Sequence, residues 1–149
     1  MDKNHIAKVF FIITNKFRRY LDKKNQKINL SNGQARVLRY IYENTKDDKE
    51  VFQKDILEAF SIRGASVNGL IEGLIKLDCI KREIDMSDKR KKKLKMTSNG
   101  NLIVLKSYEI ILEFENSLKS SLQVEELEQL EKILLKLENE IDAREKEDV

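Results

Sequence analysis

The chain has 149 residues and a net charge of +3; 37% of its residues are charged and 40% are hydrophobic. It contains no proline, five glycines and a single cysteine, so helix should dominate and an internal disulfide is excluded. The length fits one domain, residues 1–149, and the composition argues against a compact α/β enzyme.

Charge is distributed unevenly along the chain. Residues 108–149 carry 13 acidic and five basic side chains, a balance of −8, so the preceding residues must carry +11. A basic body predicts a polyanionic partner. The apolar run Val9–Ile13 is closely flanked by charges and is followed by no signal-peptide cleavage site. We therefore expect a cytoplasmic protein that does not engage a membrane.

Regular spacing of apolar residues predicts helices in the first part of the chain. Apolar residues recur every three or four positions from Ile6 to Leu21, which predicts a helix there. Ser31 and Gln34 have the spacing of a capping box, in which each side chain bonds to the backbone of the other residue. The helix that begins there should extend to about Asn44.

Two shorter helices should follow. Apolar spacing predicts them over about residues 53–60 and 65–77. The turn Ser61–Gly64 separates them and contains Arg63. Two short helices joined by a tight turn are the arrangement of a helix-turn-helix.

A hairpin is predicted after the second short helix. Residues 80–84 and 93–96 alternate between apolar and charged side chains, the pattern of two half-buried strands. Six cations lie between Asp88 and Met96, so the tip and the return strand of this hairpin are strongly basic.

Two further helices complete the chain. Thr97 is placed to cap a long helix over about residues 98–120. The last helix should cover about residues 124–144. Its apolar residues repeat at steps of three and four, which is typical of a coiled-coil seam: Leu127, Leu130, Leu134, Leu137 and Ile141.

These elements predict a mainly α protein built around a winged helix-turn-helix with a two-stranded β wing, at about residues 31–100. The second short helix can enter the major groove of DNA, where base pairs are distinguishable. An arginine at the hairpin tip can lie along the negative minor groove, and lysines can neutralise phosphates. Double-stranded DNA is therefore the predicted polyanion.

The hairpin carries a more specific signal. Asp88-Lys-Arg90, followed by the stretch Leu94–Gly100, resembles the D-x-R wing signature and the L-x-L-T-x-x-G motif of the MarR family of bacterial transcriptional regulators. Met96 stands where that motif usually has leucine. The segment Ala65–Arg82 is similar to the recognition helix and following strand of the family, and the order of helices also matches.

The resemblance implies roles for particular residues. Arg90 would be the minor-groove arginine, and Asp88 would brace the wing. The terminal helices, at about residues 5–24 and 101–146, would form an obligate homodimer.

The recognition helix departs from the family pattern in its middle. Glu72 and Gly73 stand where basic or polar residues are common. Gly69 and Gly73 each cost about 1 kcal/mol relative to alanine inside a helix, so either close packing requires them or the helix is loosely held until DNA binds. Asp78 replaces a common glycine at the helix end, which aspartate tolerates because it can adopt the left-handed conformation.

The predicted DNA-binding residues come from the wing, the recognition helix and the helix before it: Arg90, Asp88, Lys89, Lys91, Lys92, Ser66, Asn68, Arg63, Gln53 and Lys54. Several have an alternative reading. The wing lysines could serve solubility alone, Ser66 and Asn68 could cap and solvate their helix, and Gln53 could cap the short helix.

A small-molecule effector is a further implication of the resemblance, often a lipophilic or aromatic anion. Phe10, Phe17, Tyr40 and Tyr108 are the candidates for lining its cleft. The alternative is that these rings belong to the core and the dimer interface.

Cys79 precedes the first strand, where a buried structural thiol fits better than a redox sensor. His5 is the only histidine and should lie at the surface. Because one histidine and one cysteine far apart give no metal-ligand spacing, we predict neither a metal site nor a cofactor.

The predicted function is that of a dimeric, sequence-specific transcriptional regulator, a repressor that binds a pseudo-palindromic operator. The alternative is a non-catalytic winged-helix module that binds an acidic protein without specific DNA binding. An enzyme is not expected, because no nucleotide-binding loop or catalytic triad is visible and a single histidine offers little acid–base chemistry.

Overall fold

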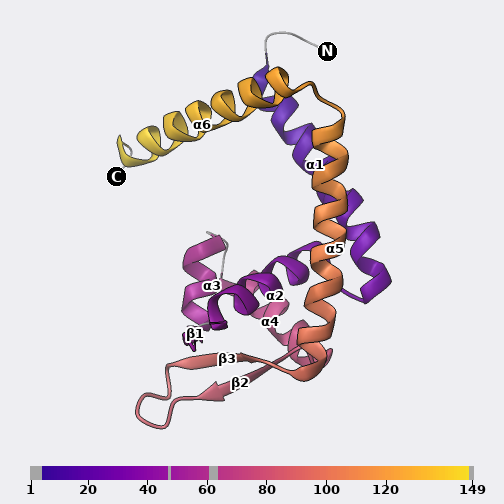
Figure 1. Ribbon diagram of the computed structural model, residues 1–149. Helices are drawn as coiled ribbons and strands as arrows, with labels where there is room; N and C mark the ends of the chain where they lie inside the picture. Colours follow the sequence, from indigo (N-terminus) through magenta and orange to yellow (C-terminus); the bar gives the residue numbers. More distant parts are fainter. Residues whose placement is uncertain (1–4, 47, 61–63, 148–149) are drawn as a thin grey trace. The chain divides into compact units, whose positions relative to one another are not determined.

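The computed structural model describes residues 5–46, 48–60 and 64–147 (Figure 1). Residue contacts divide the chain into two compact units, Met1–Ile111 and Leu112–Val149. The boundary falls within helix α5, Ser98–Ser120. No helix in the described ranges is long and apolar enough to cross a membrane.

The first unit begins with the predicted helices. Helix α1 covers Ile6–Asn25, a 3₁₀ turn η1 covers Gln26–Ile28, and helix α2 covers Asn32–Thr45. The backbone N–H of Gln34 donates to Ser31 Oγ over 3.1 Å, and that of Ser31 donates to Gln34 Oε1 over 2.8 Å. The predicted capping box is therefore confirmed, and it sets where α2 begins.

The helix-turn-helix pair is also confirmed. Helix α3 covers Gln53–Phe60 and helix α4, the predicted recognition helix, covers Gly64–Lys76. The predicted DNA-binding residue Arg63, which lies between the two helices in the sequence, is outside the described residues. The backbone N–H of Phe52 donates to Asp55 Oδ2 over 2.7 Å, so Asp55 supplies the side-chain bond at the start of α3.

The sheet differs from the prediction because it has three strands. Strands β2, Ile80–Ile84, and β3, Lys92–Met96, form the expected antiparallel wing. A third strand, β1, Val51–Phe52, pairs antiparallel with the other edge of β3, giving the order β1-β3-β2. Sequence alternation missed β1 because two residues are too few to show a period. Ile84, predicted to be half-buried, is instead exposed near the wing tip.

The junction between α4 and α5 is tightly bonded. Thr97 Oγ1 accepts from the backbone N–H of Gly100 over 2.9 Å and donates to the carbonyl of Asp78 over 2.5 Å, which confirms Thr97 as the cap of α5. Asp78 has a φ of 52°, the left-handed conformation predicted for it. A Cβ placed on Gly100 would lie 1.9 Å from the carbonyl oxygen of Cys79, so only glycine fits there.

A hydrophobic cluster among the described residues of the first unit supports the helix-turn-helix and the wing. It draws on α2, α3, α4, α5 and all three strands, and its buried residues are Leu30, Ala35, Val37, Leu38, Ile41, Val51, Ile56, Val67, Ile71, Leu74, Cys79, Ile80, Leu94 and Val104. Because α4 and β3 share this cluster, the recognition helix and the wing have a common scaffold.

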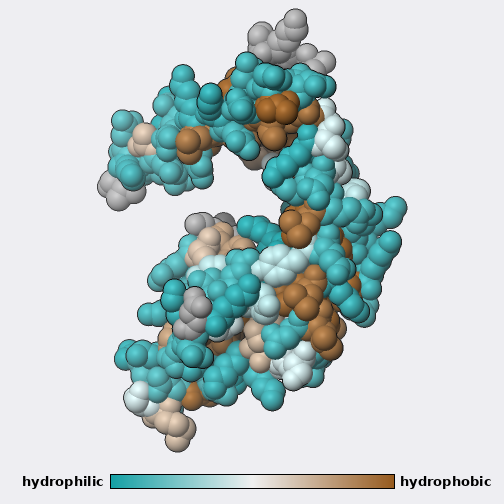
Figure 2. Space-filling view, in the orientation of Figure 1, coloured by the Kyte–Doolittle hydropathy of each residue, from teal (hydrophilic) through white to brown (hydrophobic). Residues whose placement is uncertain are grey.

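Apolar side chains are exposed on two terminal helices. Helix α6, Val124–Glu147, has no buried residue, and its seam residues Leu130, Leu134 and Ile141 are all exposed. On α1 the exposed apolar residues include Phe10, Phe11, Ile13 and Phe17. Figure 2 shows such hydrophobic patches among a mostly hydrophilic surface.

Candidate nucleic-acid interface

The tip of the wing is a compact turn organised by two aspartates. Asp88 Oδ1 accepts from the backbone N–H of Arg90 over 3.0 Å and from its Nε over 3.2 Å, and the Asp88 carbonyl accepts from the N–H of Lys91 over 2.8 Å. Asp85 accepts from the N–H and hydroxyl of Ser87, which lowers the pKa of the Asp85 carboxyl. The Arg90 side chain remains 93% exposed, so its terminal nitrogens are held outward and available.

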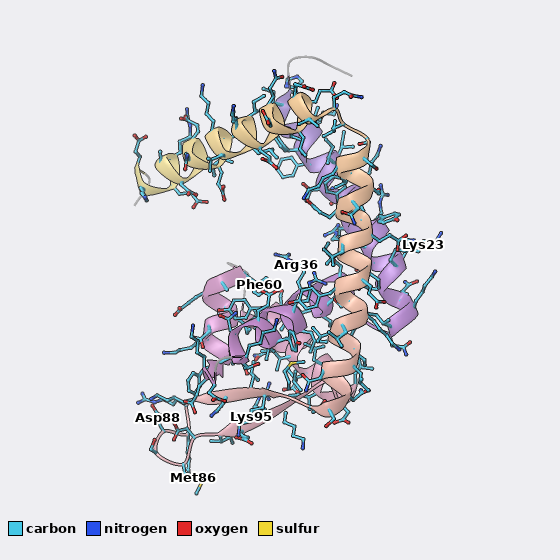
Figure 3. All side chains as sticks on the ribbon, in the orientation of Figure 1. Lys23, Arg36, Phe60, Met86, Asp88 and Lys95 are labelled. Atoms are coloured by element: carbon cyan, nitrogen blue, oxygen red, sulfur yellow. The ribbon has the colours of Figure 1, made fainter. Side chains whose placement is uncertain are left out.

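The five lysines between Asp88 and Met96 fall into two groups. On β3, Lys93 pairs with Glu50, and Lys95 pairs with Glu83 over 2.8 Å, which lowers the pKa of the Glu83 carboxyl. Within the described part of the chain, the other three lysines form no ion pair: Lys89, Lys91 and Lys92. Figure 3 shows Asp88 at the far end of the hairpin and Lys95 back along the strand. The available positive charge is therefore concentrated at the tip.

The exposed face of α4 carries the predicted base-reading residues. Ser66, Asn68, Gly69 and Glu72 are exposed, whereas the opposite face packs into the core through Val67, Ile71 and Leu74. A surface of short polar side chains on a helix is suited to the major groove, where it can reach base edges.

The two glycines of α4 have different surroundings. A Cβ on Gly73 would lie 2.2 Å from Nε2 of Gln34, the residue that completes the capping box of α2. A Cβ on Gly69 would have no neighbouring atom within 4 Å. Close packing thus accounts for Gly73, while Gly69 leaves the exposed face of the helix open beside Asn68.

The acidic residue in the middle of α4 is compensated. Arg82, on β2, donates from Nη1 to Glu72 Oε1 over 2.6 Å. Its Nε and Nη2 are buried without a hydrogen-bond partner among the described residues. This ion pair was not predicted from the sequence. Arg82 occupies an inward position of the strand between Ile80 and Ile84, and a charged side chain at such a position indicates an oppositely charged partner nearby.

A hydrogen bond of the Gln53 side chain connects α3 to α4. Its Nε2 donates to Asn68 Oδ1 on α4, and its Oε1 is buried without a partner among the described residues. The alternative that Gln53 caps α3 is wrong, because Asp55 makes the capping bond and the Gln53 side chain bonds to α4 instead. The start of α3 and the wing tip line the same hollow, which has a volume of about 380 Å³. Its lining residues are Phe52, Gln53, Lys54, Leu57, Asp88, Arg90, Lys91 and Lys92.

The four aromatic residues proposed for an effector site have varied surroundings. Tyr40 packs edge-on against Phe60 with ring centroids 5.7 Å apart, and Tyr108 packs against Tyr42 at 6.1 Å. Tyr108 also donates to Glu43; burial and this carboxylate raise the pKa of its phenol. Phe10 and Phe17 are partly exposed on α1. A role for any of the four in ligand binding stays a prediction.

Cys79 is buried at the start of β2, as a structural thiol should be. Burial, and then the negative charge of Asp78, raise the pKa of its thiol. The described part of the chain also contains no group of three or more His, Cys, Asp or Glu side chains that could hold a metal ion.

We expect Cys79 to react with a thiol reagent at pH 8 at least about tenfold more slowly in the folded protein than in urea, because the thiolate is the reactive form and a raised pKa reduces its population. Absorbance at 412 nm after addition of Ellman's reagent measures the rate, and free cysteine in the same urea concentrations serves as the control. Equal rates for the folded and unfolded protein would contradict a buried structural role.

Comparison with protein-family models finds one match in this region. Residues 28–91 match the model of the MarR family, a segment that includes α2, α3, α4 and β2 and reaches the turn at Asp88 and Arg90. Within this segment the chain is similar to the MarR family of regulators. The predicted resemblance to the MarR family is therefore confirmed for the helix-turn-helix and for the first half of the wing through Arg90.

Solved structures extend the MarR-family likeness to most of the chain. A Staphylococcus aureus MepR–DNA complex is 29% identical, covers 91% of this chain and 97% of its own, and has a TM-score of 0.83. Another structure of MepR, described as a transcription regulator of the S. aureus multidrug efflux pump MepA, is 27% identical over 91% and 98%, with a TM-score of 0.69. A cysteine-to-serine mutant of E. coli MarR, 18% identical over 89% and 95% with a TM-score of 0.70, shares the fold. No curated protein matches the chain.

Proposed function

We propose that this protein is a homodimeric, sequence-specific double-stranded DNA-binding regulator of transcription that acts as a repressor. The observation that carries the proposal is the wing tip, where Asp88 holds an outward-pointing Arg90 beside three lysines that have no acidic partner among the described residues. An arginine held in this way can enter a narrow minor groove, whose negative potential attracts it.

The remaining candidate residues fit the same docking. Ser66 and Asn68 would face base edges in the major groove, and Lys54 and the wing lysines would contact phosphates. The pairing of Glu72 with Arg82 supports this orientation, because it offsets the one carboxylate on the exposed face of α4. MepR, 29% identical over most of the chain, was solved with DNA, which supports the same partner here.

The dimer would form through the terminal helices, at about residues 5–24 and 101–146. Exposed apolar residues on α1 and along the seam of α6 support this, since contiguous apolar surface on a soluble helix usually marks an interface. Two recognition helices related by two-fold symmetry would read half-sites repeating at roughly 10 base pairs. Residues 1–149 would then act as one MarR-like unit with the winged helix at its centre.

Release by a small lipophilic or aromatic ligand is the finer part of the proposal, with Phe10, Phe17, Tyr40 and Tyr108 as the candidate contacts. Such a ligand would shift the dimer toward a form that binds DNA poorly. Linkage requires that the ligand and DNA weaken each other by the same factor, which a titration in both directions would measure.

Fluorescence anisotropy tests the DNA-binding function directly. The duplex upstream of the protein's own gene should bind far more tightly than a scrambled duplex of equal length. With about six phosphates neutralised per dimer, affinity for either duplex should fall roughly 10³-fold between about 50 and 200 mM salt. Equal affinity for both duplexes would contradict sequence-specific binding. Absence of binding to either would favour the protein-interaction module.

A further inference from the structure

The amide groups of Gln53 and Asn68 face each other across the helix-turn-helix. Gln53 is the first residue of α3, and its Nε2 donates to Oδ1 of Asn68 on α4. The Oε1 of Gln53 is buried, which leaves Asn68 as the exposed member of the pair. The bond joins residues 15 positions apart, and in it the oxygen end of the Asn68 amide faces α3.

We propose that Gln53 is a positioning residue that presents Asn68 to the major groove as a hydrogen-bond donor, and that Asn68 thereby selects guanine at one position of each half-site. This inference rests on the proposed DNA-binding function and deepens it. It assigns to Gln53 a role in specificity that acts through a second side chain.

The choice of base follows from the donor pattern. A free asparagine prefers adenine because its oxygen accepts from N6 while its amino group donates to N7. In this protein the Asn68 oxygen already accepts from Gln53, so the amino group is the part left for DNA. Guanine presents two adjacent acceptors, O6 and N7, whereas thymine presents a single acceptor, O4, beside its methyl group. Cytosine presents a donor, N4, that would face the amino group.

The surroundings of Asn68 allow a close approach. It lies in the first half of α4, the part of a recognition helix that reaches base edges. Its neighbour Gly69 has no side chain, and a Cβ there would meet no atom within 4 Å. Lys54, next to Gln53, lines the hollow shared with the wing tip, which places phosphate-binding charge beside the pair.

The test measures base preference at every position of the operator half-site, by competition anisotropy with duplexes that carry each of the four bases. The wild type should prefer guanine at one symmetric position by roughly tenfold or more. Asn68→Ala should abolish that preference. Gln53→Ala should move the preference at the same position from guanine toward adenine, because the freed Asn68 amide can then make both bonds to adenine. The double variant should be no worse than Asn68→Ala alone, because Gln53 acts through Asn68.

Gln53→Glu gives the sharpest result. A carboxylate only accepts, so Asn68 must turn its amino group toward it and offer its oxygen to the groove. The preference at that position should then move from guanine to adenine or cytosine, whose N6 and N4 are donors. Lys54→Ala is the matched control, since loss of a phosphate contact should weaken all duplexes alike and leave base preference unchanged.

Three outcomes would overturn the inference. Equal loss of affinity for every duplex in Gln53→Ala would mean that Gln53 contacts phosphate or only supports the fold. An unchanged preference for guanine in Gln53→Glu would mean that Gln53 does not set the Asn68 amide. Absence of sequence-specific binding by the wild type would overturn the proposed function itself, and the wild-type duplex titrations identify that case before any variant is made.

Discussion

Replacing Gly100 with alanine should lower the free energy of unfolding by about 3 kcal/mol, the upper end of the range for an overpacked site. The added Cβ would lie 1.9 Å from the carbonyl oxygen of Cys79, and that oxygen cannot move easily because it accepts from the backbone N–H of Thr97 over 3.1 Å. The start of α5 would have to separate from Cys79 and the start of β2. Urea unfolding followed by circular dichroism measures the change.

Gly69→Ala provides the matched control for that prediction. It makes the same substitution in a helix of the same unit, but at a position where the new Cβ meets no atom within 4 Å. Alanine should therefore stabilise the protein by about 0.5–1 kcal/mol through its higher helix propensity. If both substitutions destabilised the protein equally, the close approach at Gly100 would not be the cause.

Arg90→Ala should weaken binding to the operator duplex by about 1–3 kcal/mol. The side chain is 93% exposed, and Asp88 holds its Nε, so the substitution removes an outward-pointing cation without disturbing the core. The melting temperature should consequently stay close to that of the wild type. Anisotropy titrations at one fixed salt concentration measure the loss of affinity.

Lys95→Ala tests whether the position of a cation or the total charge of the wing determines the loss of DNA affinity. It removes the same unit of charge from the same hairpin, but Lys95 lies back on β3 and already pairs with Glu83. Its loss should weaken DNA binding clearly less than the loss of Arg90. Equal effects of the two substitutions would show that the wing contributes charge alone and that the tip has no special place in the groove.

The features that the sequence predicted are those encoded within a few residues. The capping box of Ser31 and Gln34 and the bracing of Arg90 by Asp88 each join residues two or three positions apart, so their spacing is visible in the chain. Helix bounds followed in the same way, from apolar periods of three and four residues.

The features that the sequence did not predict join distant positions. Gln53 and Asn68 are 15 residues apart, and Lys93 and Glu50 are 43 apart. Which polar side chains meet depends on how the helices and strands pack, and helix or strand periodicity carries no record of it. Strand β1 was missed for a related reason, since two residues become a strand by pairing with β3.

The order of the sheet divides the wing into a paired strand ladder and a loop, and the loop can change without changing the ladder. Because β3 is bonded on one edge to β1 and on the other to β2, its register is fixed twice, by Val51 opposite Leu94 and by Ile80 opposite Met96. The loop at residues 85–91 lies beyond this ladder. Insertions or deletions in the loop would alter how far Arg90 extends around a duplex while leaving the strand pairing and the core untouched. Under the proposed function, a change of loop length alone would change which flanking sequence of an operator the wing reaches.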